Sequence, residues 1–193
     1  MPHPPRRPGS NSRSDAALVS PKTKIRRLLV TRQANAPAKG HLIVAGRAMP
    51  CALGRSGITR FKREGDGSTP AGRFRLLGGF YRADRGARPN PKLQAIQPRF
   101  GWCDGAQSRT YNRTVQLPSA EPHELLWRPD HLYDLVVVLN YNISPVRRGR
   151  GSAIFFHLCD ETFSPTAGCV AIKQKHMRHL LPRLGKGCVM VIR

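Results

Sequence analysis

The stretch that decides the fold reads Gly-Ser-Ala-Ile-Phe-Phe-His-Leu-Cys over residues 151–159 and Pro-Thr-Ala-Gly-Cys-Val-Ala-Ile over residues 165–172. Ala153–Phe156 and Val170–Ile172 are apolar runs bounded by turn-forming residues, a pattern typical of buried strands. We therefore expect a strand, a polar loop and a second strand. A histidine then ends the first strand and a cysteine begins the second, at the two rims of the loop.

This arrangement suits nucleophilic chemistry. A thiolate is the reactive form of cysteine, whose ordinary pKa is about 8.5, so His157 would accept the proton of Cys169 or stabilise its thiolate as an ion pair. Gly168 has no side chain to block a substrate carbonyl, and its backbone N–H would contribute to an oxyanion hole. Thr166 would hydrogen-bond within the tight turn or orient His157. We predict Cys169 as nucleophile and His157 as general acid/base.

Two other interpretations fit the same residues. A buried cysteine and a histidine at a strand end are common structural residues. A zinc site formed by His157, Cys159 and Cys169 is a second alternative, but the usual Cys-x-x-Cys pairing is missing from the sequence. We therefore predict no metal site.

The stretch resembles the signature of the L,D-transpeptidase catalytic domain (the YkuD type). That signature is a histidine, a loop, then Ser/Thr-His-Gly-Cys, a hydrophobic residue and Arg or Asn. The matching residues are His157, Thr166, Gly168, Cys169 and Val170.

A second motif of the same family lies upstream. Gly65–Phe74 resembles the Gly-Asp-x-x-Thr-Pro-x-Gly turn that leads into a strand, and the whole resemblance runs from about Arg27 to Arg193. The chain also departs from the family pattern. Ala167 stands where a second histidine is common, Ala171 replaces Arg or Asn, and the loop is short. The resemblance therefore indicates a divergent branch.

The resemblance implies a mainly β fold, a curled mixed sheet or β-sandwich with one short C-terminal helix. It implies a peptidoglycan L,D-transpeptidase that cross-links stem peptides through a cysteine thioester, or an L,D-carboxypeptidase if water is the acceptor. A backbone carbonyl often orients the histidine in this family. No cofactor is implied, carbapenems would be covalent inhibitors, and the expected location is the periplasm or cell envelope.

Length and composition agree with one domain. The chain has 193 residues, of which 39% are hydrophobic. We expect a monomer with a catalytic domain over 24–193 and a disordered basic tail over 1–23. Residues 1–20 contain no apolar core typical of a signal peptide.

The net charge of +22 indicates anionic partners. Peptidoglycan carboxylates and nucleic acid both fit, but no zinc-finger or RNA-binding motif is present. We expect no specific nucleic-acid partner. An inactive basic protein that binds wall polymer or nucleic acid remains the alternative function.

The rest of the chain predicts a meander of strands. Five cysteines with irregular spacing imply no disulfide framework, and Cys159 and Cys188 are expected in the core. Arg60–Asp66 is expected to be charged and exposed. Thr69 and Arg73 would hold a rigid turn or border the substrate. The expected strands cover 25–31, 41–45, 48–53, 73–81, 132–140 and 188–192, with a turn at 35–40 and a helix over 173–184.

Residues 82–131 form a long segment rich in Arg, Pro and Asn, which predicts a lid or substrate wall. Aromatic rings beside Asn and Arg suit a peptide groove, because rings give contact area and Arg pairs with carboxylates. Alternatively, the tryptophans anchor the segment on the core. The candidate substrate-binding residues are Trp102, Tyr111, Asn112, Trp127 and Arg128.

Overall fold

The computed structural model describes residues 23–193, so the predicted tail lies outside the described residues except for its last residue. The described chain is mainly β, with one short α-helix, α1 (Gln174–Leu180), and 3-10 turns at Ala83–Arg85 and Leu181–Arg183. The strands are β1 (Ile25–Gln33), β2 (Ala36–Val44), β3 (Arg47–Ala52), β4 (Ile58–Thr59), β5 (Thr69–Pro70), β6 (Gly72–Tyr81), β7 (Leu93–Ala95), β8 (Phe100–Cys103), β9 (Thr114–Gln116), β10 (His123–Leu125), β11 (Leu135–Leu139), β12 (Phe155–Leu158), β13 (Val170–Ile172) and β14 (Leu184–Ile192).

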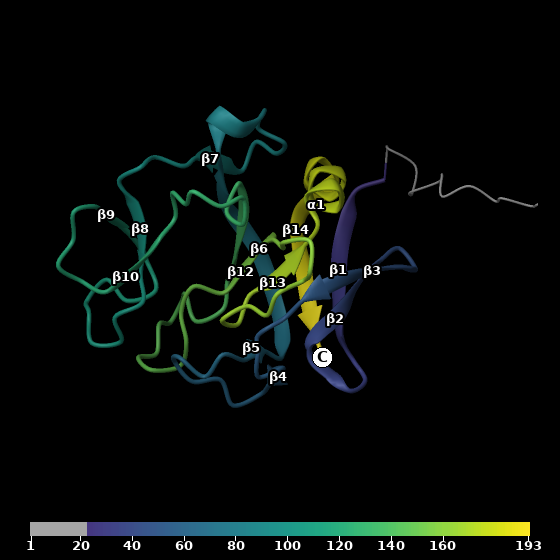
Figure 1. The fold of residues 1–193 in the computed structure, drawn as a ribbon, viewed down its shortest axis with the longest axis horizontal. Helices are drawn as coiled ribbons and strands as arrows, with labels where there is room; N and C mark the ends of the chain where they lie inside the picture. Colours follow the sequence, from purple (N-terminus) through teal and green to yellow (C-terminus); the bar gives the residue numbers. More distant parts are fainter. Residues whose placement is uncertain (1–22) are drawn as a thin grey trace, which may run out of the picture.

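The main sheet closes on itself. Its order is β11-β12-β13-β3-β2-β1-β14-β6-β7, and a further pairing of β11 with β6 completes the ring. β14 lies between β1 and β6, parallel to the first and antiparallel to the second. Figure 1 shows β14 beside β1 in the middle of the molecule, with α1 at one end. The prediction of a mainly β, mixed sheet with a short C-terminal helix is confirmed.

Strand β11 joins two apolar cores. All five of its residues are buried, as its uninterrupted apolar sequence predicts. Leu135, Val137 and Leu139 pack into the core that fills the ring. Val136 and Val138 face the opposite way, into a smaller cluster shared with residues of the 82–131 segment. That smaller cluster attaches the segment to Phe155 of β12 and to Cys169, just before β13.

Two predicted boundaries are wrong for local reasons. The first turn is at Ala34–Asn35, where Asn35 has a φ of 60°, and Pro37 and Gly40 lie inside β2. The helix ends at Leu180 because Pro182 cannot continue it, and Gly185 and Gly187 belong to β14.

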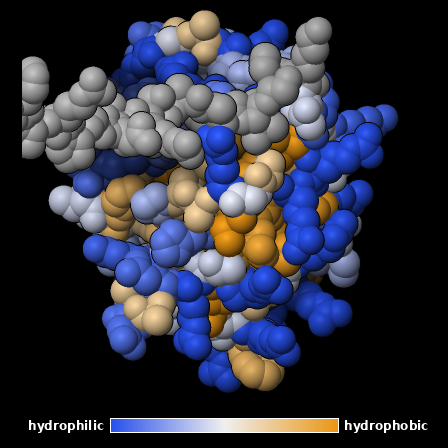
Figure 2. Space-filling view, turned by 90° about the vertical axis from the view of Figure 1, so that its right-hand side faces the viewer, coloured by the Kyte–Doolittle hydropathy of each residue, from blue (hydrophilic) through white to orange (hydrophobic). Residues whose placement is uncertain are grey.

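The 82–131 segment is not a structureless loop. It contains β7 to β10, and β10-β8-β9 form a small separate sheet, at the left of Figure 1. Figure 2 shows that the face on the right of Figure 1 is largely hydrophilic, with an apolar area near its centre. None of the helices within residues 23–193 is long and apolar enough to cross a membrane.

Candidate active site

His157 and Cys169 are brought to one face of the sheet by a parallel strand pair. β12 and β13 run parallel, with His157 opposite Ala171. Because side chains alternate along a strand, Cys169 and Ala171 lie on the same side as His157. His157 is thus the third residue of β12 rather than part of the loop rim. Ala171 is small, so it leaves space between the imidazole and the thiol.

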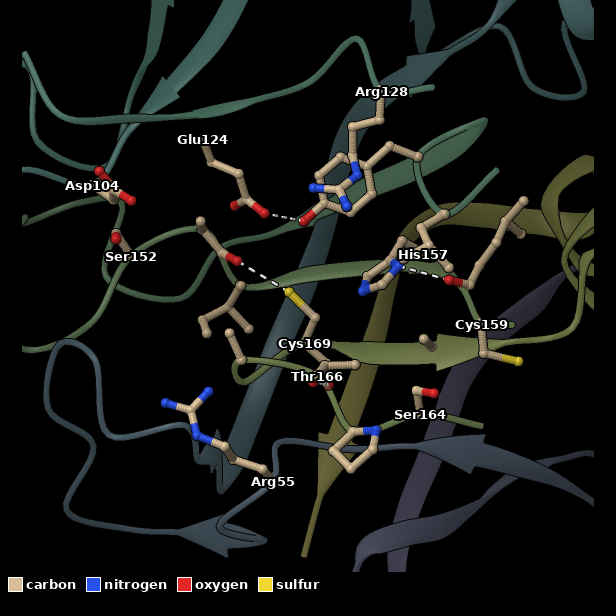
Figure 3. Close-up of a pocket in the computed structure, with 18 of the residues that line it drawn as sticks. Arg55, Asp104, Glu124, Arg128, Ser152, His157, Cys159, Ser164, Thr166 and Cys169 are labelled. Carbon is tan, nitrogen blue, oxygen red and sulfur yellow. Dashed lines mark hydrogen bonds between the residues drawn. The ribbon is translucent and has the colours of Figure 1, made fainter. Parts of the chain in front are cut away.

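The two side chains line a cavity of about 670 Å³. Figure 3 shows the Cys169 sulfur and the His157 ring on the same side of the strand pair, with Thr166 beneath them and Glu124 and Arg128 across the cavity. Cys169 is 6% exposed and His157 is 5% exposed, so both lie on its floor. A ligand that fills the cavity would reach the sulfur.

The Cys169 thiol is held as a neutral group. Its Sγ donates to the Ala153 carbonyl at 3.2 Å and accepts from the Phe155 N–H at 3.3 Å. Burial, together with the nearby Glu124 carboxylate, raises the pKa of this thiol to about 12. The thiol must therefore lose its proton to a base during attack, rather than exist as a stable thiolate beforehand.

The His157 imidazole is also neutral. Burial lowers its pKa to about 4, although the Leu158 and Leu132 carbonyls oppose the shift. Nδ1 lies 2.8 Å from the Leu158 carbonyl, which can only accept, so Nδ1 carries the hydrogen and Nε2 keeps its lone pair. A backbone carbonyl thus orients the imidazole, and the lone pair is available for a proton.

Thr166 stabilises the turn before the nucleophile. Its hydroxyl donates to the Cys169 carbonyl at 2.8 Å and accepts from the Gly168 N–H at 3.1 Å. Of the two predicted roles for Thr166, the structure shows the turn bond, and the orienting group of His157 is Leu158. The Gly168 N–H predicted for the oxyanion hole is engaged by this hydroxyl in the present geometry.

The upstream glycine-rich motif packs directly under this turn. A Cβ at position 168 would lie 2.8 Å from the Ser68 carbonyl oxygen, and φ there is +145°, so glycine is required. Thr69 is fully buried, accepts from the Gly54 N–H at 2.8 Å and donates to the Cys169 carbonyl at 3.4 Å. Thr69 therefore supports the nucleophile turn, and neither Thr69 nor Arg73 lines the cavity.

The opposite side of the cavity comes from the 82–131 segment and the residues just after it. The Tyr133 ring packs edge-on against His157, with centroids 5.1 Å apart, and its hydroxyl donates to Glu124. The Arg128 guanidinium lies 5.1 Å from the Tyr133 ring centroid and pairs with Asp130 at 2.6 Å. Burial raises the pKa of Glu124, although its bond from Tyr133 opposes this.

Only one of the five predicted substrate-binding residues lines the cavity. Arg128 lines the cavity, whereas Trp102, Tyr111, Asn112 and Trp127 do not. Trp102 packs edge-on against Phe155 at 5.1 Å and donates to Asn112 at 3.0 Å. Asn112 also accepts from the Ala153 N–H at 3.0 Å.

These contacts make Trp102 and Asn112 anchors of the segment on the catalytic strand. Tyr111 is buried and donates to Glu64. Trp127 carries the Arg82 guanidinium 3.6 Å above its ring. The alternative in which aromatic residues anchor the segment therefore describes these four residues better than direct substrate contact does.

Several cavity residues were not among the predicted ones. They carry an ionisable group or a hydroxyl group and come from segments far apart in the sequence. The additional polar residues are Arg55, Lys62, Glu64, Asp104, His123, Glu124, Tyr133, Ser152, Asp160 and Ser164. Lys62 and Glu64 stand just before the Gly65–Phe74 motif, but nothing in the sequence distinguishes them from the charged residues that are exposed.

The five cysteines occupy different environments, and none of them forms a disulfide. Cys159 lines the cavity and is partly exposed, so its predicted core position is wrong, whereas Cys188 is buried as predicted. All five cysteines are free thiols. No group of three or more His, Cys, Asp or Glu side chains suited to a metal ion occurs within the described part of the chain.

A model of the L,D-transpeptidase catalytic domain (YkuD) matches residues 22–192. Among solved structures, an L,D-transpeptidase from Mycobacterium smegmatis is similar at 14% identity and a TM-score of 0.39, covering 88% of this chain and 59% of that chain. L,D-transpeptidase 1 of Mycobacterium tuberculosis is similar at 12% identity and a TM-score of 0.36, covering 86% and 58%.

The chain spans less than two thirds of the length of both solved structures. A search of curated proteins gave no match. The family model, in contrast, covers nearly the whole sequence and includes both motifs and the two strands that hold them. This chain therefore belongs to the L,D-transpeptidase catalytic domain family.

Proposed function

We propose that the protein is a peptidoglycan L,D-transpeptidase that acts through a thioester on Cys169. The observation that carries the proposal is the placement of Cys169 and His157 on one face of a parallel strand pair, at the floor of one cavity. The proposed substrates are stem peptides of the cell wall, and the proposed location is the periplasm or cell envelope.

The first step forms the acyl-enzyme. The sulfur of Cys169 attacks the carbonyl of an L-centre that precedes a D-residue, and the thiol proton passes to Nε2 of His157. The C–N bond then breaks, and the departing amine takes that proton from the imidazolium. The low pKa of His157, about 4, makes it a weak base but a strong acid for this second transfer.

The second step releases the acyl group. The amine of another stem peptide attacks the thioester, His157 accepts the amine proton, and the sulfur leaves and regains a proton from His157. Water in place of the amine gives a carboxypeptidase. The proposed oxyanion donor is the Cys169 backbone N–H, because the Gly168 N–H bonds to Thr166.

The proposal is tested with defined tetrapeptide stems and an amine acceptor, followed by tandem mass spectrometry. We expect a new amide bond between two stems, and a covalent adduct of a carbapenem on Cys169. Cys169→Ala should abolish both, a loss of more than about a hundredfold in rate. Cys159→Ala is the matched control, because Cys159 lines the same cavity, and it should keep most of the activity.

The outcomes separate the alternative functions. Hydrolysis without cross-linking would select the carboxypeptidase. Absence of both products and of any adduct, with a reduced thiol and an intact fold, would select the inactive binding protein. Ala167, which stands where the family commonly has a second histidine, favours that alternative.

A further inference from the structure

A buried lysine is the unusual feature of the cavity. Lys62 lies between β4 and β5, in a segment predicted to be exposed, but only 4% of its side-chain surface is accessible. The predicted exposure of Arg60–Asp66 is correct for Arg60 and Arg63 but wrong for Lys62, whose side chain turns inward towards the residues around Cys169. Burying a lysine is costly unless its charge is compensated or used.

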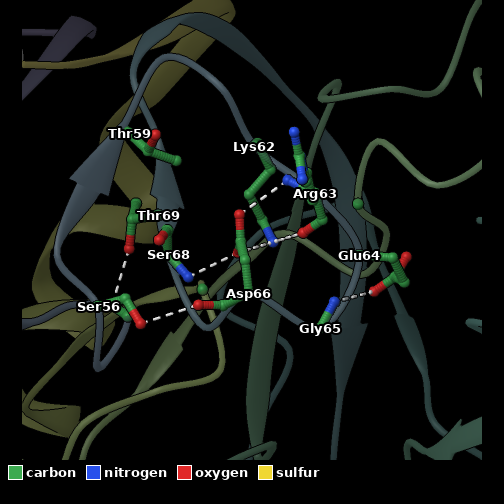
Figure 4. Close-up of polar contacts among 12 residues, drawn as sticks. Ser56, Thr59, Lys62, Arg63, Glu64, Gly65, Asp66, Ser68 and Thr69 are labelled. Atoms are coloured by element: carbon green, nitrogen blue, oxygen red, sulfur yellow. Dashed lines mark hydrogen bonds and ion pairs between the residues drawn. The ribbon is translucent and has the colours of Figure 1, made fainter.

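The ammonium of Lys62 is fixed in place. It donates to Asp66 Oδ1 at 2.6 Å and to the Arg63 carbonyl at 2.7 Å. Asp66 in turn accepts from the N–H groups of Arg63 at 2.7 Å and Ser68 at 2.8 Å, as Figure 4 shows. Partial burial opposes ionisation of Asp66, but Lys62 and the two amides outweigh it and lower its pKa.

One N–H group of the Lys62 ammonium remains available to the cavity. An ammonium has three N–H groups, and the bonds to Asp66 and Arg63 use two of them. The side chain touches the active-site backbone: a Cβ placed at Gly168 would lie 3.6 Å from Lys62 Cε, and one at Gly151 would lie 3.1 Å from it. Lys62 thus sits against the residue that precedes the nucleophile.

The charged groups around the Cys169 sulfur act on it in opposite directions. Glu124 of β10 disfavours a negative sulfur, whereas Lys62 lowers the pKa of Cys169. Tyr133, before β11, and His157, on β12, are both neutral near pH 7, because burial raises the pKa of the first and lowers that of the second. Arg55, Glu64 and Asp104 also line the cavity.

We propose that Lys62 stabilises the negative charge that develops on the sulfur of Cys169 during attack. The inference rests on Cys169 being the nucleophile proposed above. Asp66 then has two roles: it holds the ammonium in position and partly offsets its charge. The competing explanation is that the Lys62–Asp66 pair only shapes the segment between β4 and β5.

The test measures thiol reactivity and needs no substrate. Each variant is treated with iodoacetamide at pH 8, and the rate at Cys169 is followed by peptide mass spectrometry. Lys62→Met should slow alkylation by about three- to fourfold, because a pKa raised by about one unit leaves about tenfold less thiolate, which is partly offset by its greater nucleophilicity. Lys62→Arg should restore most of the rate.

Asp66→Asn should change the alkylation rate in the opposite direction from Lys62→Met. It removes a negative charge and leaves the cation, so alkylation should become faster. A purely structural pair would make both variants change the rate in the same direction, or leave it unchanged, and either result overturns the proposal. If Lys62→Met does not fold by circular dichroism, an unchanged or slower Asp66→Asn rate still overturns it.

Lys173→Met is the matched control. Lys173 pairs with Glu161 and does not line the cavity, so this variant should alkylate at the wild-type rate. Because no stem peptide is used, a failure of cross-linking would leave these results interpretable. The two hypotheses can therefore fail separately.

Discussion

The neutral imidazole of His157 links the active site to acid stability. Burial lowers its pKa from 6.5 to about 4 in the folded protein, so the unfolded chain binds a proton more readily. Stability from this group is complete above pH 6.5 and is lost as pH falls towards 4. We expect a loss of about 3 kcal/mol in the free energy of unfolding. Urea titrations at pH 7 and pH 4 measure this loss in the free energy of unfolding.

A pair of variants isolates this effect. His157→Gln should lose less stability than the wild type between pH 7 and pH 4, because it has no imidazole to protonate. His131→Gln is the control, since the His131 side chain is 79% exposed. Equal pH dependence in the wild type and His157→Gln would contradict the assignment.

Single residues were predictable only where the signal was local. The spacing of His157, Thr166, Gly168 and Cys169 was visible because the turn and its two strands are continuous in sequence. Lys62 and Glu124 carried no such signal, since they reach the cavity from a different loop and a different sheet. Charge alone did not distinguish Lys62 from the many exposed basic residues.

The turn before β13 requires glycine at position 168, because the Ser68 backbone packs closely against it. In Gly168→Ala, the added carbon would meet the Ser68 carbonyl at 2.8 Å, in a backbone conformation at φ +145° that side chains rarely adopt. We expect a loss of about 2–3 kcal/mol in stability and a large fall in acyl transfer, because the sulfur would move. Thermal unfolding and the stem-peptide assay measure the two effects.

Gly46→Ala provides the comparison. Gly46 has φ +78°, and a Cβ there would meet nothing within 4 Å, so this variant bears backbone strain without a clash. It should cost about 1–2 kcal/mol and leave catalysis unchanged. If Gly168→Ala behaved in the same way, the packing of Ser68 under the nucleophile would not matter.

Apolar runs located the strands well, but they could not give pairing direction. β12 and β13 run parallel although the loop between them is short, and an apolar run reads the same in either direction. The small sheet β10-β8-β9 was missed because β9 and β10 have only three residues each, all at least partly exposed, and β8 has only four. Their structure depends on anchoring by Trp102 rather than on a periodic pattern.

The charge of the whole molecule predicts DNA binding that depends on the salt concentration and not on the DNA sequence. With a net charge of +22, the protein should bind duplex DNAs of unrelated sequence equally. Affinity should fall by about tenfold or more between roughly 50 and 200 mM salt, because counterions compete for the phosphates. Fluorescence anisotropy with two duplexes tests this.

Acyl transfer between short stem peptides should change less than DNA binding over the same salt range. Charges inside the cavity are screened less than charges on the surface. A strong preference for one DNA sequence would instead support nucleic acid as the functional partner.

The position of β14 has a consequence for biosynthesis. The ring stays open between β1 and β6 until residues 184–192 are available, because β14 is hydrogen-bonded to both neighbours. A nascent chain that already contains His157 and Cys169 but lacks residues 184–192 therefore cannot close its main sheet.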